Sequence, residues 1–366
     1  MKVLWMTWKD RSHPRSGGAE IVNEELAKRL AGAGHEVVFL VAGFGKAAKE
    51  DVRDGFRVVR LGDHYTVYWY AYRYYQRHLK GWADVVIDEL NTMPFFCRFY
   101  VREKTFFFPH QLCRQVWFYQ MPFPISFIGY CLEPIYLWLL RKYDVITISE
   151  STKQDLMRYG FRSERIHLIP EGIEITPAAD IDVLEKFERP TLLSLGSIRA
   201  MKRTKHQIAA FELAKKTIPN LQMKIAGDVQ SDYGSEVLRM IARSPFRKDI
   251  EYVGKVSREK KIELMQKSHL ILVTSVKEGW GLIVTEAASQ GTPAVVYDVD
   301  GLRDSVKNGV TGIVTRENTE YGLAEAIVKL LMNEEEYARM RNNAYKASLE
   351  FTFDASYEQF LQIIKN

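Results

Sequence analysis

The stretch of sequence that decides the fold reads LILVTSVKEGWGLIVTE over residues 270–286. Its first five residues form an apolar and β-branched run, Gly279 and Gly281 then mark a turn, and residues 282–286 open a second apolar segment. A strand without polar alternation is typical of a parallel sheet that is covered on both faces. The stretch therefore predicts a strand, a glycine turn and a helix in succession, which is the repeating unit of an α/β fold.

The same alternation of strands and helices continues along nearly the whole chain. A helix with apolar residues at helical spacing is predicted over residues 19–31, after the first strand. Strands are predicted at residues 2–7, 36–42, 85–87, 105–108, 145–148 and 166–169, and in a second series at residues 191–195, 222–226, 250–253, 270–274, 293–297 and 312–314. Two such series predict two doubly wound α/β domains.

The length of the chain agrees with two domains. A chain of 366 residues exceeds one ordinary hydrophobic core. Residues 170–190 contain three prolines and separate the two series of strands. We therefore expect a first domain at residues 1–169 and a second at residues 170–350. A cleft between two such domains is where ligands are expected to bind, because strand carboxyl ends and helix N-termini point into it.

Composition and charge narrow the function classes. Apolar residues make up 46% and charged residues 27%, which is typical of a soluble globular protein. The net charge of +5 lies in the first half, where residues 1–169 hold 24 basic and 18 acidic side chains, and it is too small to favour nucleic acid as a partner. Three cysteines without a C-x-x-C pair argue against disulfides and structural zinc. A start that is charged by Lys9 and Asp10 predicts no signal peptide, and hence a cytoplasmic protein.

Two segments of the first half are unusually aromatic or apolar. Residues 65–82 contain eight aromatic residues among basic ones, and residues 116–140 carry one charged side chain, Glu133. The second segment is long enough to span a bilayer, but Pro122, Pro124 and Pro134 argue against a continuous spanning helix. Two interpretations stay open. The segments form a buried helix–turn–helix whose aromatics fill the core, or an aromatic and basic surface that lies on a membrane or binds a lipid-linked ligand.

The turn after residues 270–274 contains the groups that we expect to bind a ligand. A helix that begins near Gly281 leaves backbone N–H groups free at its N-terminus, and these groups hold phosphate well. Gly279 and Gly281 lack the Cβ atoms that would keep a ligand away. Glu278 on the turn and Glu286 in the helix can both accept hydrogen bonds from hydroxyl groups. Two acids beside a phosphate-binding turn suit a ligand with an anionic centre and polyol ends, such as a nucleotide-sugar.

The spacing of Glu278 and Glu286, with Gly279-Trp280-Gly281-Leu282 between them, resembles the Glu-x7-Glu signature of a large family of retaining GT-B glycosyltransferases (family four, of the glycosyl transferases group 1 type). Further matches follow in the family's order at Ser16-Gly17-Gly18-Ala19-Glu20, Phe108-Pro109-His110, Pro170-Glu171-Gly172-Ile173, Lys202, Ala226-Gly227-Asp228, Val253-Gly254-Lys255 and Gly291-Thr292-Pro293. The resemblance implies two Rossmann-like domains that face each other across a cleft. It also implies a C-terminal helix, at about residues 351–366, that crosses back to the first domain.

The resemblance implies an activity as well as a fold. The expected reaction moves a hexosyl group from a nucleoside-diphosphate sugar, a UDP- or GDP-sugar, to a hydroxyl of a glycan, glycolipid or lipid-linked acceptor. It retains the anomeric configuration and needs neither metal nor cofactor. The first domain is expected to bind the acceptor and the second the donor. Apart from the resemblance, the aromatic segments at residues 65–82 and 116–140 are the basis for expecting peripheral contact of the first domain with the cytoplasmic face of a membrane.

Roles for individual residues follow from the same resemblance. Lys202 matches the lysine that binds the departing phosphate, Glu278 the acid that holds a hydroxyl of the transferred sugar, and Glu286 the acid that holds the ribose. His110 matches a histidine near the transferred sugar and the acceptor. The remaining donor-binding candidates are Gly17, Gly18, Ser197, Arg199, Gly254, Lys255, Gly279, Trp280, Gly281 and Leu282. Two structural alternatives stay open: Lys202 within a solvated basic patch, and His110 as a hydrogen-bonded core residue.

One position departs from the family's pattern. The family has an arginine directly after the glycine that Gly196 matches, whereas this chain has Ser197. Arg199 lies two residues further on and is the candidate substitute. If it does not substitute, stabilisation of the leaving group depends more heavily on Lys202.

Two other motifs are interpreted as structural, and two alternative functions stay open. Residues 43–48 mimic a dinucleotide-binding fingerprint but follow the second strand, so we interpret them as a loop. Asp298 and Asp300 resemble a metal-binding acid pair, which we interpret as a turn. A nucleotide-sugar epimerase or hydrolase on the same fold would release epimer or free sugar without an acceptor. A non-catalytic nucleotide-sugar-binding protein is disfavoured by Glu278, Glu286 and Lys202.

Overall fold

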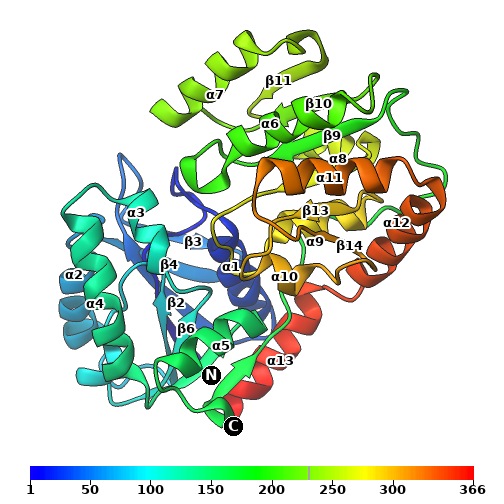
Figure 1. Ribbon diagram of the computed structural model, residues 1–366. Coiled ribbons are helices and arrows are strands. Elements are labelled where there is room, and N and C mark those ends of the chain that lie inside the picture. Colours follow the sequence, from blue (N-terminus) through cyan, green and yellow to red (C-terminus); the bar gives the residue numbers. More distant parts are fainter. Residues whose placement is uncertain (230) are drawn as a thin grey trace. The chain divides into compact units, whose positions relative to one another are not determined.

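The computed structural model describes residues 1–229 and 231–366, which divide into two compact units. Unit 1 comprises Met1–Gly172 and Thr352–Asn366, and unit 2 comprises Ile173–Phe351 (Figure 1). Each unit is built on one largely parallel sheet flanked by helices. The α/β fold class predicted from the sequence is therefore confirmed.

Unit 1 contains an eight-stranded sheet, counted over the described residues, in the order β3-β4-β2-β1-β5-β6-β7-β8. Neighbouring strands run parallel, except that β3 and β4 are antiparallel. The strands are β1 (Lys2–Met6), β2 (Glu36–Ala42), β3 (Glu50–Arg53), β4 (Phe56–Leu61), β5 (Val85–Leu90), β6 (Lys104–Pro109), β7 (Asp144–Thr147) and β8 (Ile166–Leu168). Because β2 and β5 lie on opposite sides of β1, the chain changes direction across the sheet at the carboxyl end of β1.

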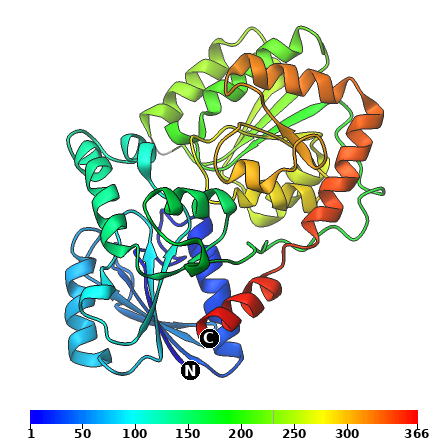
Figure 2. The ribbon, with the colours of Figure 1, turned by 60° about the horizontal axis from the view of Figure 1, so that its bottom comes forward.

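The helices of unit 1 include the last one in the sequence. They are α1 (Gly18–Gly32), α2 (Val67–Tyr74), α3 (Trp117–Gln120), α4 (Ile125–Leu140), α5 (Glu150–Arg158) and α13 (Phe353–Lys365). Figure 2 shows α13 lying beside α1, as the contacts between the two helices require. Arg29 donates to Asp354 at 2.7 Å, and the buried ring of Phe360 stacks on Trp5 at 5.4 Å between centroids. The C-terminal helix is thus an integral part of unit 1.

Two strands of unit 1 were missed by the sequence prediction. β3 is a short edge strand of sequence EDVR, which has no apolar face. β4 carries Arg57 and Arg60 within its six residues, and Arg60 is nevertheless buried because its Nη2 pairs with Asp10 Oδ2 at 2.6 Å. The residues at 43–48, which mimic a dinucleotide fingerprint, lie in the loop before β3, as expected.

The two aromatic segments form helices. Residues 65–82 form α2 and a following π-helical turn at Tyr75–Leu79, with one face buried and Trp69 exposed. Residues 116–140 form α3 and α4, so the predicted helix–turn–helix is present, but the prediction that it is buried is wrong for one face of α4. No helix among the described residues combines the length and apolar character needed to cross a bilayer.

Unit 2 contains a six-stranded sheet within the described residues, in the order β11-β10-β9-β12-β13-β14, and all pairs are parallel. The strands are β9 (Thr191–Leu195), β10 (Gln222–Ala226), β11 (Ile250–Gly254), β12 (Leu270–Val273), β13 (Ala294–Val296) and β14 (Gly312–Val314). The helices are α6 (Thr204–Lys215), α7 (Asp232–Arg243), α8 (Arg258–Lys267), α9 (Leu282–Ser289), α10 (Leu302–Ser305), α11 (Glu320–Leu331) and α12 (Glu334–Ser348). From β9 the chain proceeds to β10 on one side, and from β12 to β13 on the other. The two adjacent strands β9 and β12 therefore flank the point where the winding reverses, which is where such sheets bind ligands.

Candidate active site

Two loops meet beyond the carboxyl ends of β9 and β12 in unit 2. The first runs over residues 196–203 and contains a short 3₁₀ turn at Ala200–Lys202, and the second runs over residues 274–281. The Val276 N–H donates to Met201 O at 2.8 Å, and Thr274 Oγ1 donates to Lys202 O at 2.8 Å. These bonds fasten the loops to each other, so the topology brings Lys202 to the glycine turn that the sequence singled out.

Lys202 and Glu278 form an ion pair between the two loops. Lys202 Nζ contacts Glu278 Oε1, and Ser275 Oγ donates to the same oxygen at 2.5 Å. The Lys202 side chain is 27% exposed and the Glu278 side chain 16%, so solvent reaches the pair. The Lys202 ammonium thus faces a carboxylate of the candidate site, although its side chain is partly exposed to solvent.

A third loop, at residues 297–301 between β13 and α10, contacts the backbone of the glycine turn. Glu278 N–H donates to Asp300 O at 3.2 Å, and Lys277, which is buried, pairs with Asp300 Oδ2 at 2.9 Å. Gly301 has φ +79°, and a Cβ placed on it would lie 2.3 Å from Glu278 O. Only glycine fits there. Asp298 and Asp300 both pair with Arg303, and within the described residues no cluster of metal-ligating side chains is found.

The helix α9 begins directly after this turn. Gly281 adopts φ +94°, and a Cβ on it would lie 2.8 Å from Leu302 Cδ2, so glycine is required for the chain to enter the helix at Leu282. Trp280 Nε1 donates to Thr285 Oγ1 at 2.9 Å, and its ring packs against Phe351 at 5.1 Å between centroids. The Trp280 side chain thus braces the turn directly before the N-terminus of α9, and helix N-termini are positions that bind anions.

Glu286 lies on α9 and also has a lysine partner. Lys261 Nζ on α8 donates to Glu286 Oε2 at 2.6 Å. Burial raises the pKa of the Glu286 carboxyl, and Lys261 opposes that shift. Both glutamates of the sequence motif are therefore paired with a lysine from another element. Lys202 was predicted from the sequence, whereas Lys261 was not, because it lies on a highly charged helix where no single lysine stands out.

The remaining donor-binding candidates of unit 2 lie at strand ends. Ser197 and Arg199 are exposed on the loop after β9. Partial loss of hydration lowers the pKa of Arg199, and the Glu278 carboxylate opposes this shift. The role of Arg199 as the substitute arginine stays a prediction. Gly254, with φ +80°, ends β11 and accepts from the Gly227 N–H at 2.8 Å, and Lys255 beside it is exposed.

In unit 1 the glycine loop precedes α1. Gly17 caps the helix and Gly18 is its first residue. The buried Glu20 accepts from the Gly17 N–H at 2.5 Å and pairs with Lys9 Nζ at 3.2 Å. The glycine loop is thus held by an acid from the first turn of its own helix.

His110 follows β6 and is buried in a polar cluster of unit 1. Its Nε2 lies 3.1 Å from Asn23 Oδ1 and 3.7 Å from Glu89 Oε1. Burial lowers the pKa of His110 to about 3, and burial together with the Glu20 carboxylate raises the pKa of Glu89 to about 8. The imidazole is therefore neutral near pH 7, and it serves as a hydrogen-bonding group rather than a proton donor. Glu89 and Asn23 were not singled out by the sequence, because they lie in an otherwise apolar strand and helix.

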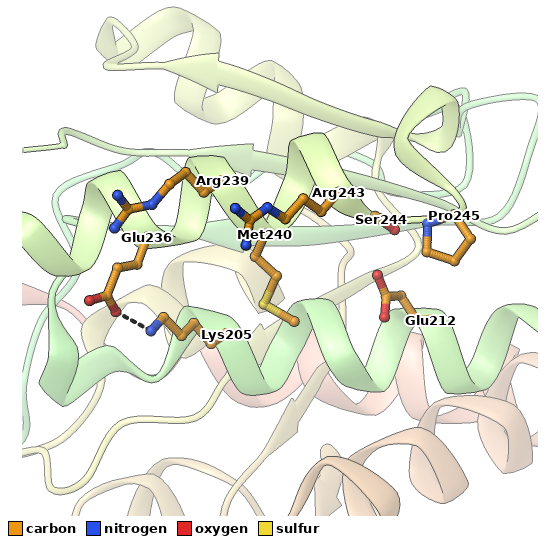
Figure 3. A pocket seen from close by; sticks show the side chains of 8 residues that line it. All are labelled: Lys205, Glu212, Glu236, Arg239, Met240, Arg243, Ser244 and Pro245. Carbon is orange, nitrogen blue, oxygen red and sulfur yellow. Dashed lines mark hydrogen bonds and ion pairs between the residues drawn. The ribbon is translucent and has the colours of Figure 1, made fainter.

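A cavity of about 590 Å³ lies elsewhere in unit 2, between α6 and α7 (Figure 3). Lys205 and Glu236 form an ion pair across it, and Arg239 and Arg243 extend along its α7 side. None of the residues of the glycine turn lines it. This cavity is therefore separate from the candidate active site.

Known proteins resemble the chain in both halves. The family model described as glycosyl transferases group 1 matches residues 179–347, and the model described as glycosyltransferase family 4 matches residues 16–176. Glycogen synthase from Mycobacterium tuberculosis is 27% identical over 220 residues, covering 59% of this chain and 52% of that protein. N-acetyl-alpha-D-glucosaminyl L-malate synthase from Bacillus anthracis is 22% identical over 364 residues, covering 92% and 91%. The chain spans about half the length of the first curated relatives that it matches.

Solved structures share the fold over the whole chain. Sucrose-phosphate synthase from Thermosynechococcus elongatus has a TM-score of 0.81 at 19% identity, covering 100% of this chain and 98% of that one. HepE from Anabaena, solved in complex with UDP and glucose, has a TM-score of 0.75 at 17% identity, covering 100% and 99%. The fold is that of the GT-B glycosyltransferases. With both halves matched by its sequence models, the chain belongs to the group 1 glycosyl transferases.

Proposed function

We propose that this protein transfers a hexosyl group from a nucleoside-diphosphate sugar to a hydroxyl of a glycan, glycolipid or lipid-linked acceptor. The observation that carries the proposal is the glycine turn at the N-terminus of α9, flanked by Glu278 and Glu286 that are each paired with a lysine. This arrangement offers cations and helix amides for a diphosphate, and carboxylates for the hydroxyl groups on either side of it.

Donor binding is an exchange of partners in this proposal. The donor's phosphate oxygens replace Glu278 as the partner of Lys202. A hydroxyl of the sugar then donates a hydrogen bond to the Glu278 carboxylate. Glu286 accepts from the ribose hydroxyls in the same manner, next to Lys261. A ligand with both an anion and hydroxyl groups satisfies all four side chains, whereas an uncharged sugar leaves Lys202 with its original partner.

The chemistry follows from the charge that develops on the leaving group. Breaking the sugar–phosphate bond places negative charge on the departing diphosphate, and stabilising that charge lowers the barrier. Lys202, the amides at the start of α9 and Arg199 supply this stabilisation. We propose retention of the anomeric configuration without a metal ion, with the departing phosphate helping to deprotonate the acceptor hydroxyl. His110, neutral near pH 7, hydrogen-bonds the transferred sugar or the acceptor.

A ligand-binding experiment tests the donor class. We expect uridine or guanosine diphosphate, but not adenosine diphosphate, to raise the melting temperature. At one hundred times Kd the gain is about 2.7 kcal/mol, or roughly 5–10 °C for a unit of this size. The UDP held by HepE favours uridine as the first choice. No binding of any nucleoside diphosphate by calorimetry would contradict the proposal.

The products separate transfer from its alternatives. Incubation of the preferred nucleotide-sugar without an acceptor is expected to leave the donor largely intact. Rapid release of free sugar, or conversion to an epimer, would instead indicate a hydrolase or epimerase on the same fold. Proton NMR of the transferred sugar then reads the anomeric configuration directly.

A further inference from the structure

The outer face of α4 in unit 1 carries no polar side chain. Its exposed residues are Ile125, Phe127, Ile128, Cys131, Leu132, Ile135, Trp138 and Leu139. The large side chains in this set are between 40% and 56% exposed. A surface helix of a soluble protein normally turns its apolar stripe inward and its polar residues to water, so α4 has the opposite arrangement.

The polar residues of α4 face inward instead. Ser126 and Glu133 are buried, and the Glu133 carboxylate accepts from the N–H groups of Cys113 and Arg114 at 2.7 and 2.6 Å. Trp117 Nε1 donates to it at 3.1 Å. The single acid of the helix thus fixes which face points outward. The apolar outer face is consequently held in place, and it is not the result of a loosely attached helix.

Neighbouring residues enlarge this surface. Phe118 and Tyr119 on α3 and Phe123 in the turn before α4 are exposed, Phe123 by 82%, and the Phe118 ring packs on Tyr130 at 5.2 Å between centroids. We call the outer face of α4 together with these three residues the α4 patch. Large side chains that are about half exposed present on the order of 100 Å² each. The patch therefore exceeds the few hundred Å² of contiguous apolar surface that monomeric soluble proteins show.

Basic residues border the α4 patch. Arg141 lies over the Trp138 ring at 4.0 Å, Arg114 lies over the Tyr130 ring at 4.2 Å, and Lys142 is exposed. Between residues 104 and 142 the chain has four basic side chains and one acid, the buried Glu133. An apolar centre with Trp and Tyr and a basic border complements the surface of a membrane that contains anionic lipids.

We propose that the α4 patch docks this protein on an anionic phospholipid surface, with α4 lying in the plane of the interface and its outer face among the acyl chains. The helix has 16 residues, a length of about 24 Å, which is too short to cross a hydrocarbon core of about 30 Å. A second copy of the chain fits less well. A two-fold interface through the patch would join two basic borders, and between residues 104 and 142 neither copy offers an exposed acid to pair with them.

Vesicle flotation with the full chain tests the proposal. Wild type is expected to float with vesicles that contain phosphatidylglycerol and far less with pure phosphatidylcholine. The variant Ile128→Ser/Leu132→Ser/Ile135→Ser is expected to lose at least tenfold in binding. A matched control, Val310→Ser/Tyr321→Ser/Met332→Ser, removes three exposed apolar side chains of unit 2 and is expected to bind as wild type. Equal losses in both variants, or no flotation of wild type, would overturn the proposal.

A charge variant and a label test the same contact independently. Arg141→Gln/Lys142→Gln is expected to weaken binding about fivefold per charge removed, and added salt is expected to weaken wild-type binding in the same way. Cys131 lies on the outer face, whereas Cys97 and Cys113 are buried, so an environment-sensitive thiol dye reports on α4 in the native chain. A blue shift on adding anionic vesicles is expected, and its absence would contradict insertion.

Two further readouts separate this proposal from its competitors. Sedimentation that shows a dimer of wild type, dissociated by the Ile128→Ser/Leu132→Ser/Ile135→Ser variant, without vesicle binding would assign the patch to self-association and overturn the membrane proposal. Nucleoside-diphosphate binding by the same variant is expected to equal that of wild type, because the patch and the glycine turn belong to different units. Membrane docking and the proposed donor site can therefore fail separately.

Discussion

The candidate residues of unit 2 and those of unit 1 differ in how their charges are balanced. In unit 2, Glu278 and Glu286 form ion pairs with Lys202 and Lys261, and solvent reaches the Lys202 pair. In unit 1, His110 and Glu89 lie deeply buried, and burial favours the uncharged form of each. One unit therefore presents charges that are already compensated, and the other presents neutral polar groups.

This difference matches the ligands that each unit would serve. A compensated ion pair can change partners when an anion with hydroxyl groups arrives, at little net electrostatic cost. A neutral imidazole beside an amide suits a neutral hydroxyl, such as that of the proposed acceptor, because no buried charge then needs a partner. We therefore expect substitutions in unit 2 to change donor binding and turnover. Substitutions of the buried groups in unit 1 should instead change how the stability of the fold depends on pH.

The largest effect is expected from Lys202→Ala. Loss of the cation that we propose faces the leaving group should lower kcat by about 10²–10³, or roughly 3–4 kcal/mol of barrier. Arg203→Ala is the matched control, since its guanidinium lies over the Tyr297 ring at 5.8 Å and not at Glu278, and it should stay near wild type. Steady-state transfer kinetics measure both. Equal losses for the two variants would reject the placement of Lys202.

An intermediate effect is expected from Glu286→Gln. Removing a charged hydrogen-bond acceptor costs about 1.5–3 kcal/mol of binding, so donor Kd should rise about 10- to 100-fold with kcat little changed. Glu263→Gln on the neighbouring α8 removes an exposed acid that pairs with Lys260 and should have no effect. Calorimetry with the preferred nucleoside diphosphate measures the difference. A fall in kcat without a change in Kd would show that Glu286 does not act on the ribose.

The smallest effect is expected in unit 1, from Glu89→Gln. A carboxyl whose pKa is raised to about 8 on folding stabilises the fold most at low pH, and this contribution is lost as the pH rises through 8. Wild type should lose about 1 kcal/mol between pH 7 and 8 from this group, or roughly 2–4 °C in melting temperature. The variant should lack that loss. Glu164→Gln, an exposed acid of the same unit, should keep the wild-type profile, and a similar flattening there would contradict the assignment.

The sequence predicted most of the fold because its strands are apolar runs. Every strand predicted from such a run is present, with ends that shift by at most three residues. β3 and β4 were missed since their charged side chains conceal the strand pattern, and Arg60 becomes buried through a partner, Asp10, that is 50 positions away. The group 1 family and the GT-B fold were also predicted correctly.

The sequence predicted the glycine turn of the candidate site but not the ion-pair partners of its side chains. Glycine turns are visible in a sequence, because Gly279 and Gly281 stand next to Glu278. Ion pairs such as Lys261 with Glu286 join separate elements and require the folded chain. Burial is equally invisible: residues 116–140 carry an apolar composition that suits a core, and only the structure shows that the outer face of α4 is exposed. The roles of the site residues stay predictions.

The ion pair between Lys202 and Glu278 has a consequence for selectivity among anions. Inorganic phosphate brings a negative charge but no ring of hydroxyl donors, so binding Lys202 would leave the Glu278 carboxylate without its ion-pair partner and with Ser275 as its hydrogen-bond donor. A complete nucleotide-sugar compensates both partners at once. Under the proposed function, the resting ion pair therefore disfavours small anions relative to a complete nucleotide-sugar.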